Sequence, residues 1–249
     1  MSRFFVETKK DPQIGDDIYI EGSDARHISL VLRKAVGAEL EVVCGNSPFI
    51  AEIIKINENR VELLLKQVLP AAKEADLQLY LLQGIAKGEK MELIIQKAVE
   101  LGVSTVIPLA CERSVVQLKG DKAIDRQKRW QKIAEAAAKQ CGRDKIPEIL
   151  PVQNLQNALL CLPENTQIIM PWESETENSL GKLLAAKPPQ KAAVIIGPEG
   201  GLTVAEVKTA KAKGAEVVTL GPRILRTETA AVSAVAIIMF AWGDIGGKA

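Results

Sequence analysis

The amino-acid sequence predicts an α/β protein in which a small β-rich domain precedes a larger domain with a mostly parallel sheet and helices on both faces. Two patterns carry this prediction. Up to about Leu69, short strands follow one another with turn residues between them, and from Leu77 onward strands alternate with helices. The pattern changes within residues 70–74, so we expect one domain over residues 1–72 and a second over residues 73–249.

The first domain is expected to be a compact β-barrel with one or two short helices. Its clearest strands are residues 40–44, 49–56 and 61–68. A short helix should run from Ser23, as its N-cap, to Arg33. Its apolar positions Ile28, Val31 and Leu32 fit one face, which should cover the barrel.

The second domain should contain six strands and two long helices. The expected strands are residues 77–83, 105–109, 146–152, 167–170, 193–196 and 217–220, and the expected long helices are residues 89–101 and about 122–141. Shorter helical pieces should lie between the later strands. The polar segment 173–179 should form a surface loop.

Two glycine-containing loops near the C-terminus are the most informative part of this domain. They are IIGPEGGLTVAEV at residues 195–207 and LGPRILRTETAAVSAV at residues 220–235, and each follows a β-branched strand and opens a helix. Thr203 and Glu206 have the spacing of a capping box, and Thr227 or Thr229 is the expected cap of the second helix. Two such loops on adjacent parallel strands would form a ligand-binding crevice. On spacing alone, the first loop could equally be a tight connection without a ligand.

Together, the two loops resemble the last two knot-forming motifs of the SPOUT class of RNA methyltransferases. That class binds S-adenosylmethionine in a trefoil-knotted C-terminal fold, so the resemblance implies a knot that periodicity alone would not reveal. Within the class, the chain resembles the N3-specific uridine methyltransferases of small-subunit ribosomal RNA. The matching stretches are RFFV at 3–6, HISLVLR at 27–33, KGEKMELIIQKAVELGV at 87–103, ERSVV at 112–116, RWQKIAEAAAKQCGR at 129–143 and the two loops.

The resemblance covers nearly the whole chain in order and departs from the family pattern at a few positions. The family usually has Asp where Glu89 stands, Thr where Val99 stands, and Glu-Gln-Ser at residues 139–141. None of these positions lies in the cofactor loops. The resemblance also implies that the first domain is a PUA-like β-barrel, which is a fold used for RNA binding.

The resemblance implies three loops that bind S-adenosylmethionine, largely through backbone groups. The implied residues are Met170 and Pro171 in the first loop, Gly197, Pro198, Gly200 and Gly201 in the second, and Leu220, Gly221, Ile224, Leu225 and Thr229 in or just after the third. Gly200 and Gly201 are expected to let the backbone approach the ligand without a Cβ atom in the way.

Three charged residues within these motifs are candidates for the catalytic step. Loss of the N3 proton of uridine spreads negative charge onto O2 and O4, and the guanidinium of Arg226 is our candidate to stabilise it. Glu199 and Glu228 are candidate bases. Their alternative roles are structural, because Glu199 can accept backbone N–H bonds and Glu228 can sit at a helix N-terminus.

The net charge of +1 does not by itself indicate a nucleic-acid-binding protein, but residues 119–145 carry nine basic against four acidic side chains. On a helical wheel, one face carries Lys128, Lys132, Lys139 and Arg143, and the opposite face carries Trp130, Ile133, Ala134, Ala137 and Cys141. The basic face is either a solvated helix surface or a stripe that follows RNA phosphates. Arg3, Arg26, His27 and Arg33 could extend that stripe onto the barrel, or be ordinary surface residues.

The remaining features concern assembly and location. The C-terminal helix over residues 230–242 is apolar on every face apart from Ser233 and must be covered on all sides. Burial within one subunit would achieve this, but a homodimer interface is the favoured interpretation. The four cysteines lack metal-binding spacing, so we expect no metal and no disulfide. The N-terminus lacks the apolar segment of a secretion signal, and the C-terminal apolar run is too short to cross a bilayer, so a soluble cytoplasmic protein is expected.

Three functions fit these features. The leading interpretation is N3 methylation of a uridine. A SPOUT ribose 2′-O-methyltransferase is the nearest alternative, although that group typically has Asn where Pro198 stands. A non-catalytic RNA-binding assembly factor is the third, and the intact glycines of the two loops weigh against it.

Overall fold

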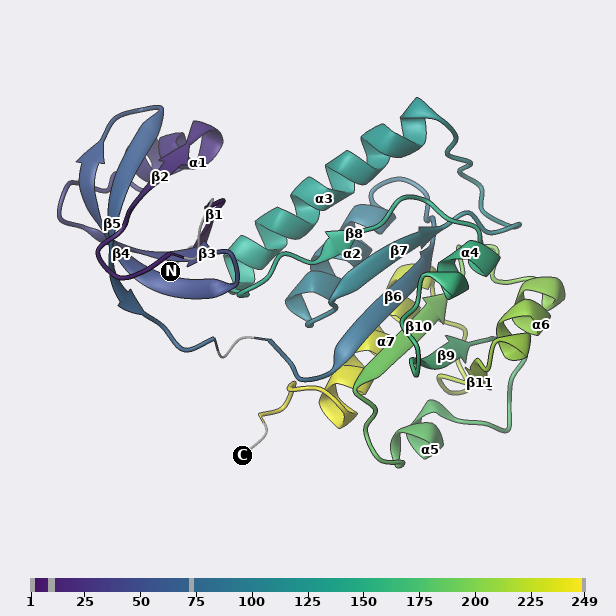
Figure 1. Ribbon diagram of the computed structural model, residues 1–249. Coiled ribbons are helices and arrows are strands. Elements are labelled where there is room, and N and C mark those ends of the chain that lie inside the picture. The colour runs from purple at the N-terminus through teal and green to yellow at the C-terminus, as the bar shows by residue number, and fades with distance from the viewer. Residues whose placement is uncertain (1–2, 9–11, 72–73, 248–249) are drawn as a thin grey trace. The chain divides into compact units, whose positions relative to one another are not determined.

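The computed structural model describes residues 3–8, 12–71 and 74–247, and the chain forms two compact units (Figure 1). The first unit comprises Met1–Glu74 together with Ala138–Lys145, and the second comprises Ala75–Ala137 and Ile146–Ala249. The change of unit after Glu74 lies close to the boundary expected at residues 72 and 73. The return of residues 138–145 to the first unit was not expected.

The first unit is built on a five-stranded sheet in the order β1-β3-β4-β5-β2. Its strands are β1 (Arg3–Val6), β2 (Asp17–Glu21), β3 (Glu39–Cys44), β4 (Ser47–Ile56) and β5 (Arg60–Val68). β1 runs parallel to β3, and the other pairs are antiparallel. The core includes the fully buried Val42, Ile53 and Leu63, and along β4 and β5 the buried Ile53 and Leu63 alternate with more exposed residues. The three strands predicted for this region are therefore confirmed.

The predicted helix of the first unit is wrong in detail. It consists of α1 (Gly22–Arg26) followed by the π-helical turn η1 (His27–Val31), and Glu21 rather than Ser23 occupies the N-cap position. Of the three residues expected on one apolar face, Ile28 is fully buried, whereas Val31 and Leu32 are exposed. The wider turn explains the difference: the N–H of Leu32 bonds to the carbonyl of His27, five residues back, so the 3.6-residue spacing does not hold here.

The second unit is built on a six-stranded sheet in the order β11-β9-β10-β6-β7-β8, in which every pair is parallel. Its strands are β6 (Gln78–Gly84), β7 (Thr105–Leu109), β8 (Glu148–Ile149), β9 (Gln167–Pro171), β10 (Lys191–Ile196) and β11 (Glu216–Val218). The predicted parallel sheet is confirmed, although β8 is much shorter than the expected 146–152. The two glycine-containing loops were expected on adjacent strands, and the strand order shows that this was wrong. The strands that lead into them, β10 and β11, are separated by β9.

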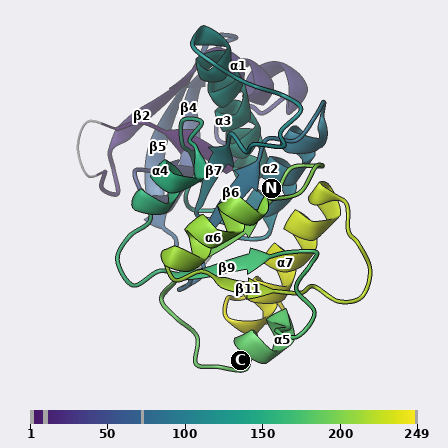
Figure 2. The same cartoon turned by 90° about the vertical axis from the view of Figure 1, so that its right-hand side faces the viewer.

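Helices cover both faces of this sheet (Figures 1 and 2). They are α2 (Lys90–Glu100), α3 (Asp121–Cys141), α4 (Leu155–Leu160), α5 (Leu180–Leu184), α6 (Val204–Ala212) and α7 (Thr227–Ala241). Leu82 of β6 and Ile195 of β10 share one core cluster with residues of α4 and α6. The neighbouring Leu81 and Val194 are equally buried and point to the opposite face, where α7 packs on β10 and on α2.

The observed helix α3 differs from the prediction at its C-terminal end. Trp130, Ala134 and Ala137 are buried as expected, but Cys141 is exposed. Since the helix ends at Cys141, Arg143 lies beyond it and does not continue the helical stripe.

Helix α7 is buried along one side and exposed along the other. Ala234, Val235 and Ile238 are fully buried within the single chain, whereas Ile237 and Phe240 are 43% and 68% exposed. Its N-cap is Arg226 rather than Thr227 or Thr229, and no side chain caps it. No helix in the described ranges is both long enough and apolar enough to cross a membrane.

Candidate functional site

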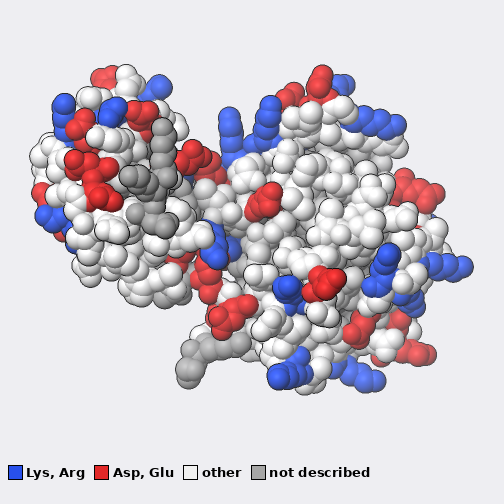
Figure 3. Space-filling view, in the orientation of Figure 1, with Lys and Arg blue, Asp and Glu red and all other residues white. Residues whose placement is uncertain are grey.

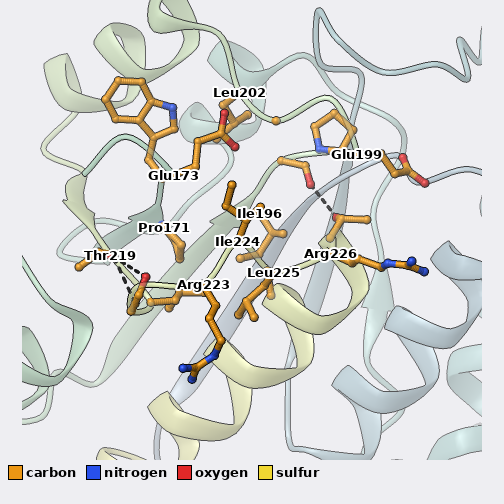
Figure 4. Close-up of a pocket in the computed structure, with 18 of the residues that line it drawn as sticks. Pro171, Glu173, Ile196, Glu199, Leu202, Thr219, Arg223, Ile224, Leu225 and Arg226 are labelled. Carbon is orange, nitrogen blue, oxygen red and sulfur yellow. Dashed lines mark hydrogen bonds between the residues drawn. The ribbon is translucent and has the colours of Figure 1, made fainter. Parts of the chain in front are cut away.

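A cavity of about 380 Å³ opens at the carboxyl ends of β9, β10 and β11 in the second unit. Three loops form most of its wall, over residues 171–173, 196–199 with 201–202, and 219–227, and Lys90 of α2 and Ala230 of α7 complete it. Figure 4 shows Glu173 and Leu202 on one side of this cavity and the side chains of Ile224 and Leu225 entering it from the third loop. The crevice expected at this edge of the sheet is therefore present.

Most residues implied as cofactor-binding line this cavity. They are Pro171, Gly197, Pro198, Gly201, Leu220, Gly221, Ile224 and Leu225. The other three, Met170, Gly200 and Thr229, are not among the described residues that line it, and Met170 is fully buried in β9. Two lining residues, Trp172 and Glu173, were not predicted: they follow directly after the first loop, and Glu173 was expected in the surface loop over residues 173–179.

The glycines of the second loop have structural roles that differ from the expected one. Gly201 has a φ of +70°, and a Cβ atom there would lie 3.1 Å from the Glu173 carboxylate. At Gly200, a Cβ atom would lie 2.9 Å from both Cβ and the carbonyl oxygen of Arg113. Gly200 therefore makes room for a neighbouring segment of the protein rather than for a ligand.

Thr227 joins three elements at the wall of the cavity. The side-chain amide of Gln83, near the end of β6, donates a hydrogen bond to Thr227 Oγ1 at 3.0 Å. The Thr227 hydroxyl in turn donates to the carbonyl of Gly197 at 2.7 Å. Thr227 and Gln83 are buried, so this chain of bonds fixes the start of α7 against the second loop.

The predicted capping box at the end of the second loop is confirmed. The Thr203 hydroxyl accepts the backbone N–H of Glu206, and the Glu206 carboxylate accepts the backbone N–H of Thr203. Glu206 also accepts the backbone N–H of Glu112 at 3.0 Å, which attaches the loop after β7 to the same helix start.

The two candidate bases both pair with Lys90. The Lys90 ammonium lies 3.5 Å from Glu199 Oε1 and 3.4 Å from Glu228 Oε2. Glu199 also accepts the backbone N–H of Lys87 at 3.0 Å. Partial burial raises the pKa of Glu199, but the N–H of Lys87, its own backbone N–H and Lys90 together outweigh burial and leave that pKa lowered. The carboxylate is therefore a weaker base than an ordinary glutamate.

The candidate catalytic arginine lies at the mouth of the cavity. Arg226 is exposed, lines the cavity and immediately precedes α7. Arg223, from the same loop, also lines the cavity, and Figure 4 shows the two guanidinium groups pointing in different directions.

Two of the residues proposed to contact RNA are buried in the first unit. Arg3 is 3% exposed and pairs with Glu41 and Asp144. Arg143 is buried and pairs with Glu74. A buried guanidinium needs its carboxylate partners, so neither side chain can serve as a surface contact, and both leave the set of candidate RNA-binding residues.

The remaining basic candidates lie at or near the surface. Arg26 and Arg33 are exposed and His27 is half-buried in the first unit, where Lys139 pairs with Asp24 at 2.8 Å. Lys128 and Lys132 are exposed on α3. On the face drawn in Figure 3, basic and acidic side chains are interspersed, without one dominant basic surface.

The cysteines are free thiols, and two of them are buried. Burial raises the pKa of the Cys44 thiol to about 11 and that of Cys111 to about 12, with Glu206 adding to the effect at Cys111. Among the residues that the structure describes, no group of His, Cys, Asp and Glu side chains is arranged to hold a metal ion.

Comparison with known proteins gives consistent results along the chain. A family model described as RNA methyltransferase domain matches residues 73–239. The chain is 33% identical over 248 residues to the ribosomal RNA small subunit methyltransferase E of Bacillus subtilis, with 96% of each chain covered.

Two solved structures are also similar. The crystal structure of a ribosomal RNA small subunit methyltransferase E from Neisseria gonorrhoeae, bound to S-adenosyl methionine, has a TM-score of 0.87 at 31% identity, and the match covers 98% of this chain and 99% of that one. A putative methyltransferase from Legionella pneumophila, in complex with the bound cofactor SAM, has a TM-score of 0.85 at 32% identity, with 97% of this chain and 98% of that one covered.

Proposed function

Because this chain belongs to the ribosomal RNA small subunit methyltransferase E family, we propose that it transfers a methyl group from S-adenosylmethionine to N3 of a uridine in small-subunit (16S) ribosomal RNA. The observation that carries the proposal is the three-loop cavity at the carboxyl ends of β9, β10 and β11. Its lining combines backbone polar groups with apolar side chains, as a nucleoside cofactor requires.

The residues of the cavity fit this cofactor. Ile196, Leu202 and Leu225 offer apolar contacts for an adenine ring, and the Gly197–Gly201 and Leu220–Gly221 backbones offer hydrogen-bonding groups. Bound S-adenosylmethionine supplies a methyl group on a positively charged sulfonium. The protein's task is then to align the uridine with that methyl group and to exclude water from it.

We assign the stabilisation of the uridine anion to Arg226. Its guanidinium can donate to O2 or O4, where the charge develops as N3 loses its proton. Glu199, with its lowered pKa and its bond from Lys87, anchors the second loop rather than acting as the base. Glu228 occupies the first turn of α7, where a carboxylate also favours the helix dipole.

RNA binding is proposed for both units. The first unit would act as a PUA-like barrel whose exposed Arg26 and Arg33, with His27, contact the backbone. Lys128 and Lys132 of α3 would contribute from the second unit. We propose that assembled small subunits in the cytoplasm are the substrate, because the target then has a shape that naked RNA lacks.

A homodimer is proposed as the active species. Ile237 and Phe240 form an exposed apolar stripe on α7, and Ile224, beside the cavity, is 89% exposed. Covering these residues with a second copy would bury the stripe and complete the cofactor site from the partner subunit. The trefoil knot stays a proposal too, supported by the contact of Thr227 with Gly197 that packs the third loop against the second.

Nucleoside mass spectrometry tests the proposed function. Small ribosomal subunits that lack the modification are incubated with the protein and methyl-labelled S-adenosylmethionine, and their RNA is digested. Labelled N3-methyluridine is the expected product. Label on a ribose would support the 2′-O-methyltransferase alternative, and the absence of label would support a non-catalytic assembly factor.

A further inference from the structure

Lys90 is the cavity-lining residue contributed by α2, and it lies outside both glycine-containing loops. It is the first residue of that helix. Its ammonium lies between two carboxylates from different elements, Glu199 of the second loop and Glu228 of α7, which are 26% and 18% exposed. The side chain is thus held at the wall of the cavity from two sides.

The two ion pairs hold the ammonium but do not use all of its hydrogen-bond donors. Its distances to the two carboxylates, 3.5 and 3.4 Å, exceed the roughly 2.7–2.9 Å of a tight charged hydrogen bond. On the same helix, Lys97 lies 2.8 Å from Glu100, within that range. Because an ammonium carries three N–H donors, Lys90 can still donate toward a ligand in the cavity.

The charged side chains near Lys90 are two carboxylates and the arginines of the third loop. Glu199 and Glu228 are its acidic neighbours, and Arg223 and Arg226 are the basic residues of the third loop that line the same cavity. From α3, Arg126 and Arg129 pair with Glu92 and so belong to a separate cluster. Glu228 Oε2 is buried and accepts no hydrogen bond, so an ammonium nearby is its main compensation.

We propose that Lys90 is a further catalytic residue, whose ammonium contacts O2 or O4 of the target uridine and, with Arg226, stabilises the charge that develops on the base. In this step the N3–H bond breaks and its proton passes to solvent water. N3 then bonds to the methyl carbon while the carbon–sulfur bond breaks, and that electron pair stays on sulfur. Lys90 keeps its own protons throughout. This inference rests on the proposed function.

The competing role for Lys90 is a structural bridge that ties α2 to the second loop and to α7. The two roles differ in what a neutral replacement changes. Loss of a bridge would loosen the cavity, lowering cofactor affinity and melting temperature. Loss of an anion-stabilising cation would instead raise the pH that the bound uridine needs to ionise.

The experiment compares Lys90→Met and Lys90→Arg with Lys97→Met, a matched control that removes a similarly exposed lysine of the same helix. Turnover on small subunits is measured across pH, S-adenosylmethionine affinity by calorimetry, and melting temperature by scanning calorimetry. For Lys90→Met we expect roughly 10²-fold lower turnover and a rate plateau shifted upward by about one pH unit or more. Cofactor affinity should stay near the wild-type value. The melting temperature should fall, because Glu228 loses its nearby ammonium, but the shift of the rate plateau should remain at temperatures where the variant is fully folded. Lys90→Arg should keep most of the turnover, and Lys97→Met all of it.

Two results would overturn the role of Lys90. One is wild-type turnover in Lys90→Met. The other is a loss of turnover that follows lost cofactor affinity or melting temperature, with the pH plateau unmoved. The nucleoside analysis of RNA treated with the wild-type protein separates the two failures. If that RNA contains no labelled N3-methyluridine, the proposed function itself is wrong, and the role of Lys90 is wrong with it.

Discussion

Arg226 lies where the third loop of the cavity becomes helix α7, and it is the N-cap of that helix. Its side chain is free to reach a substrate because the cap position is not filled by a side-chain hydrogen bond. The residue that follows, Thr227, is buried and bonded to Gly197. Thr227 is thus fixed in the fold, while the side chain of the neighbouring Arg226 is exposed at the cavity.

Replacing Arg226 with lysine tests the role of the guanidinium. Arg226→Lys keeps a positive charge but loses the planar donor fork, so turnover should fall by roughly 10²-fold while RNA affinity changes little. Raising the pH should restore part of the rate, because hydroxide then supplies the anion. Single-turnover kinetics and filter binding measure the two quantities. Normal turnover with weakened RNA binding would leave Arg226 as a positioning residue.

Replacing Thr227 with valine tests the buried hydrogen-bond chain. Thr227→Val keeps the shape but removes the hydroxyl, which leaves the Gly197 carbonyl without this donor and should lower the free energy of unfolding by about 1–3 kcal/mol. Thr227→Ser, which keeps the hydroxyl, should cost less. Urea unfolding of both variants checks this. Equal stability of Thr227→Val and the wild type would mean that water replaces the bond.

At the scale of the elements, the second loop should tolerate no side chain at Gly201. Gly201→Val places a β-branched residue at a φ of +70° and brings its Cβ to the Glu173 carboxylate, so cofactor affinity should fall at least about 10-fold. Gly214→Val is the matched control, because Gly214 has a φ of +83° and open space around it. Both variants should melt earlier, but calorimetry should detect weakened cofactor binding in Gly201→Val alone. Unchanged affinity there would contradict the proposed site.

Helix α7 offers a direct test of the dimer. Ala234 is fully buried within the chain, so a charge there would unfold the helix rather than report on a partner. Phe240 is exposed, and Phe240→Glu should yield a folded monomer with little activity. Val204→Glu on α6, which alters another exposed apolar residue, should remain dimeric. Sedimentation measures the assembly state, and a fully active monomer would rule the dimer interface out.

The elements were predictable to very different degrees. The strands of the parallel sheet were found because both of their faces are buried, which gives continuous apolar runs such as Ala192–Ile196. The π-helical turn was not found, since its spacing departs from the 3.6-residue period. The placement of β9 between β10 and β11 was also missed, because the order of strands in a sheet is not written in the order of the chain.

The candidate site was predictable where backbone conformation dictates the residue. Gly201 and Gly221 were found because glycine is favoured at their positive φ. Lys90 and Glu173 were missed because ordinary charged residues on a helix and in a loop carry no local signal of what lies opposite them. Arg3 was misjudged for the same reason: its partner Asp144 is distant in sequence, so its burial could not be anticipated.

At the scale of the whole molecule, RNA binding should depend on salt through a few exposed lysines. Replacing Lys128 and Lys132 with glutamine removes two cations, so the slope of log affinity against log salt should become shallower by about 1–2. Lys208 and Lys213, exposed on or just after α6, give a control pair that should leave the slope unchanged. Cofactor affinity should stay constant in both. An unchanged slope for the α3 variant would remove that helix from the RNA surface.

A chain emerging from the ribosome exposes the first unit before that unit can be completed. Arg3 can pair with Glu41 early, but its second carboxylate partner, Asp144, is not available until residues 138–145 have been translated. The same holds for Arg143, the partner of Glu74. At ~5–20 residues per second, the intervening stretch of roughly seventy residues takes on the order of ten seconds. The first unit therefore cannot be completed until more than half of the chain has been translated, and a fragment that stops at Glu74 would leave Arg3 with Glu41 but without Asp144.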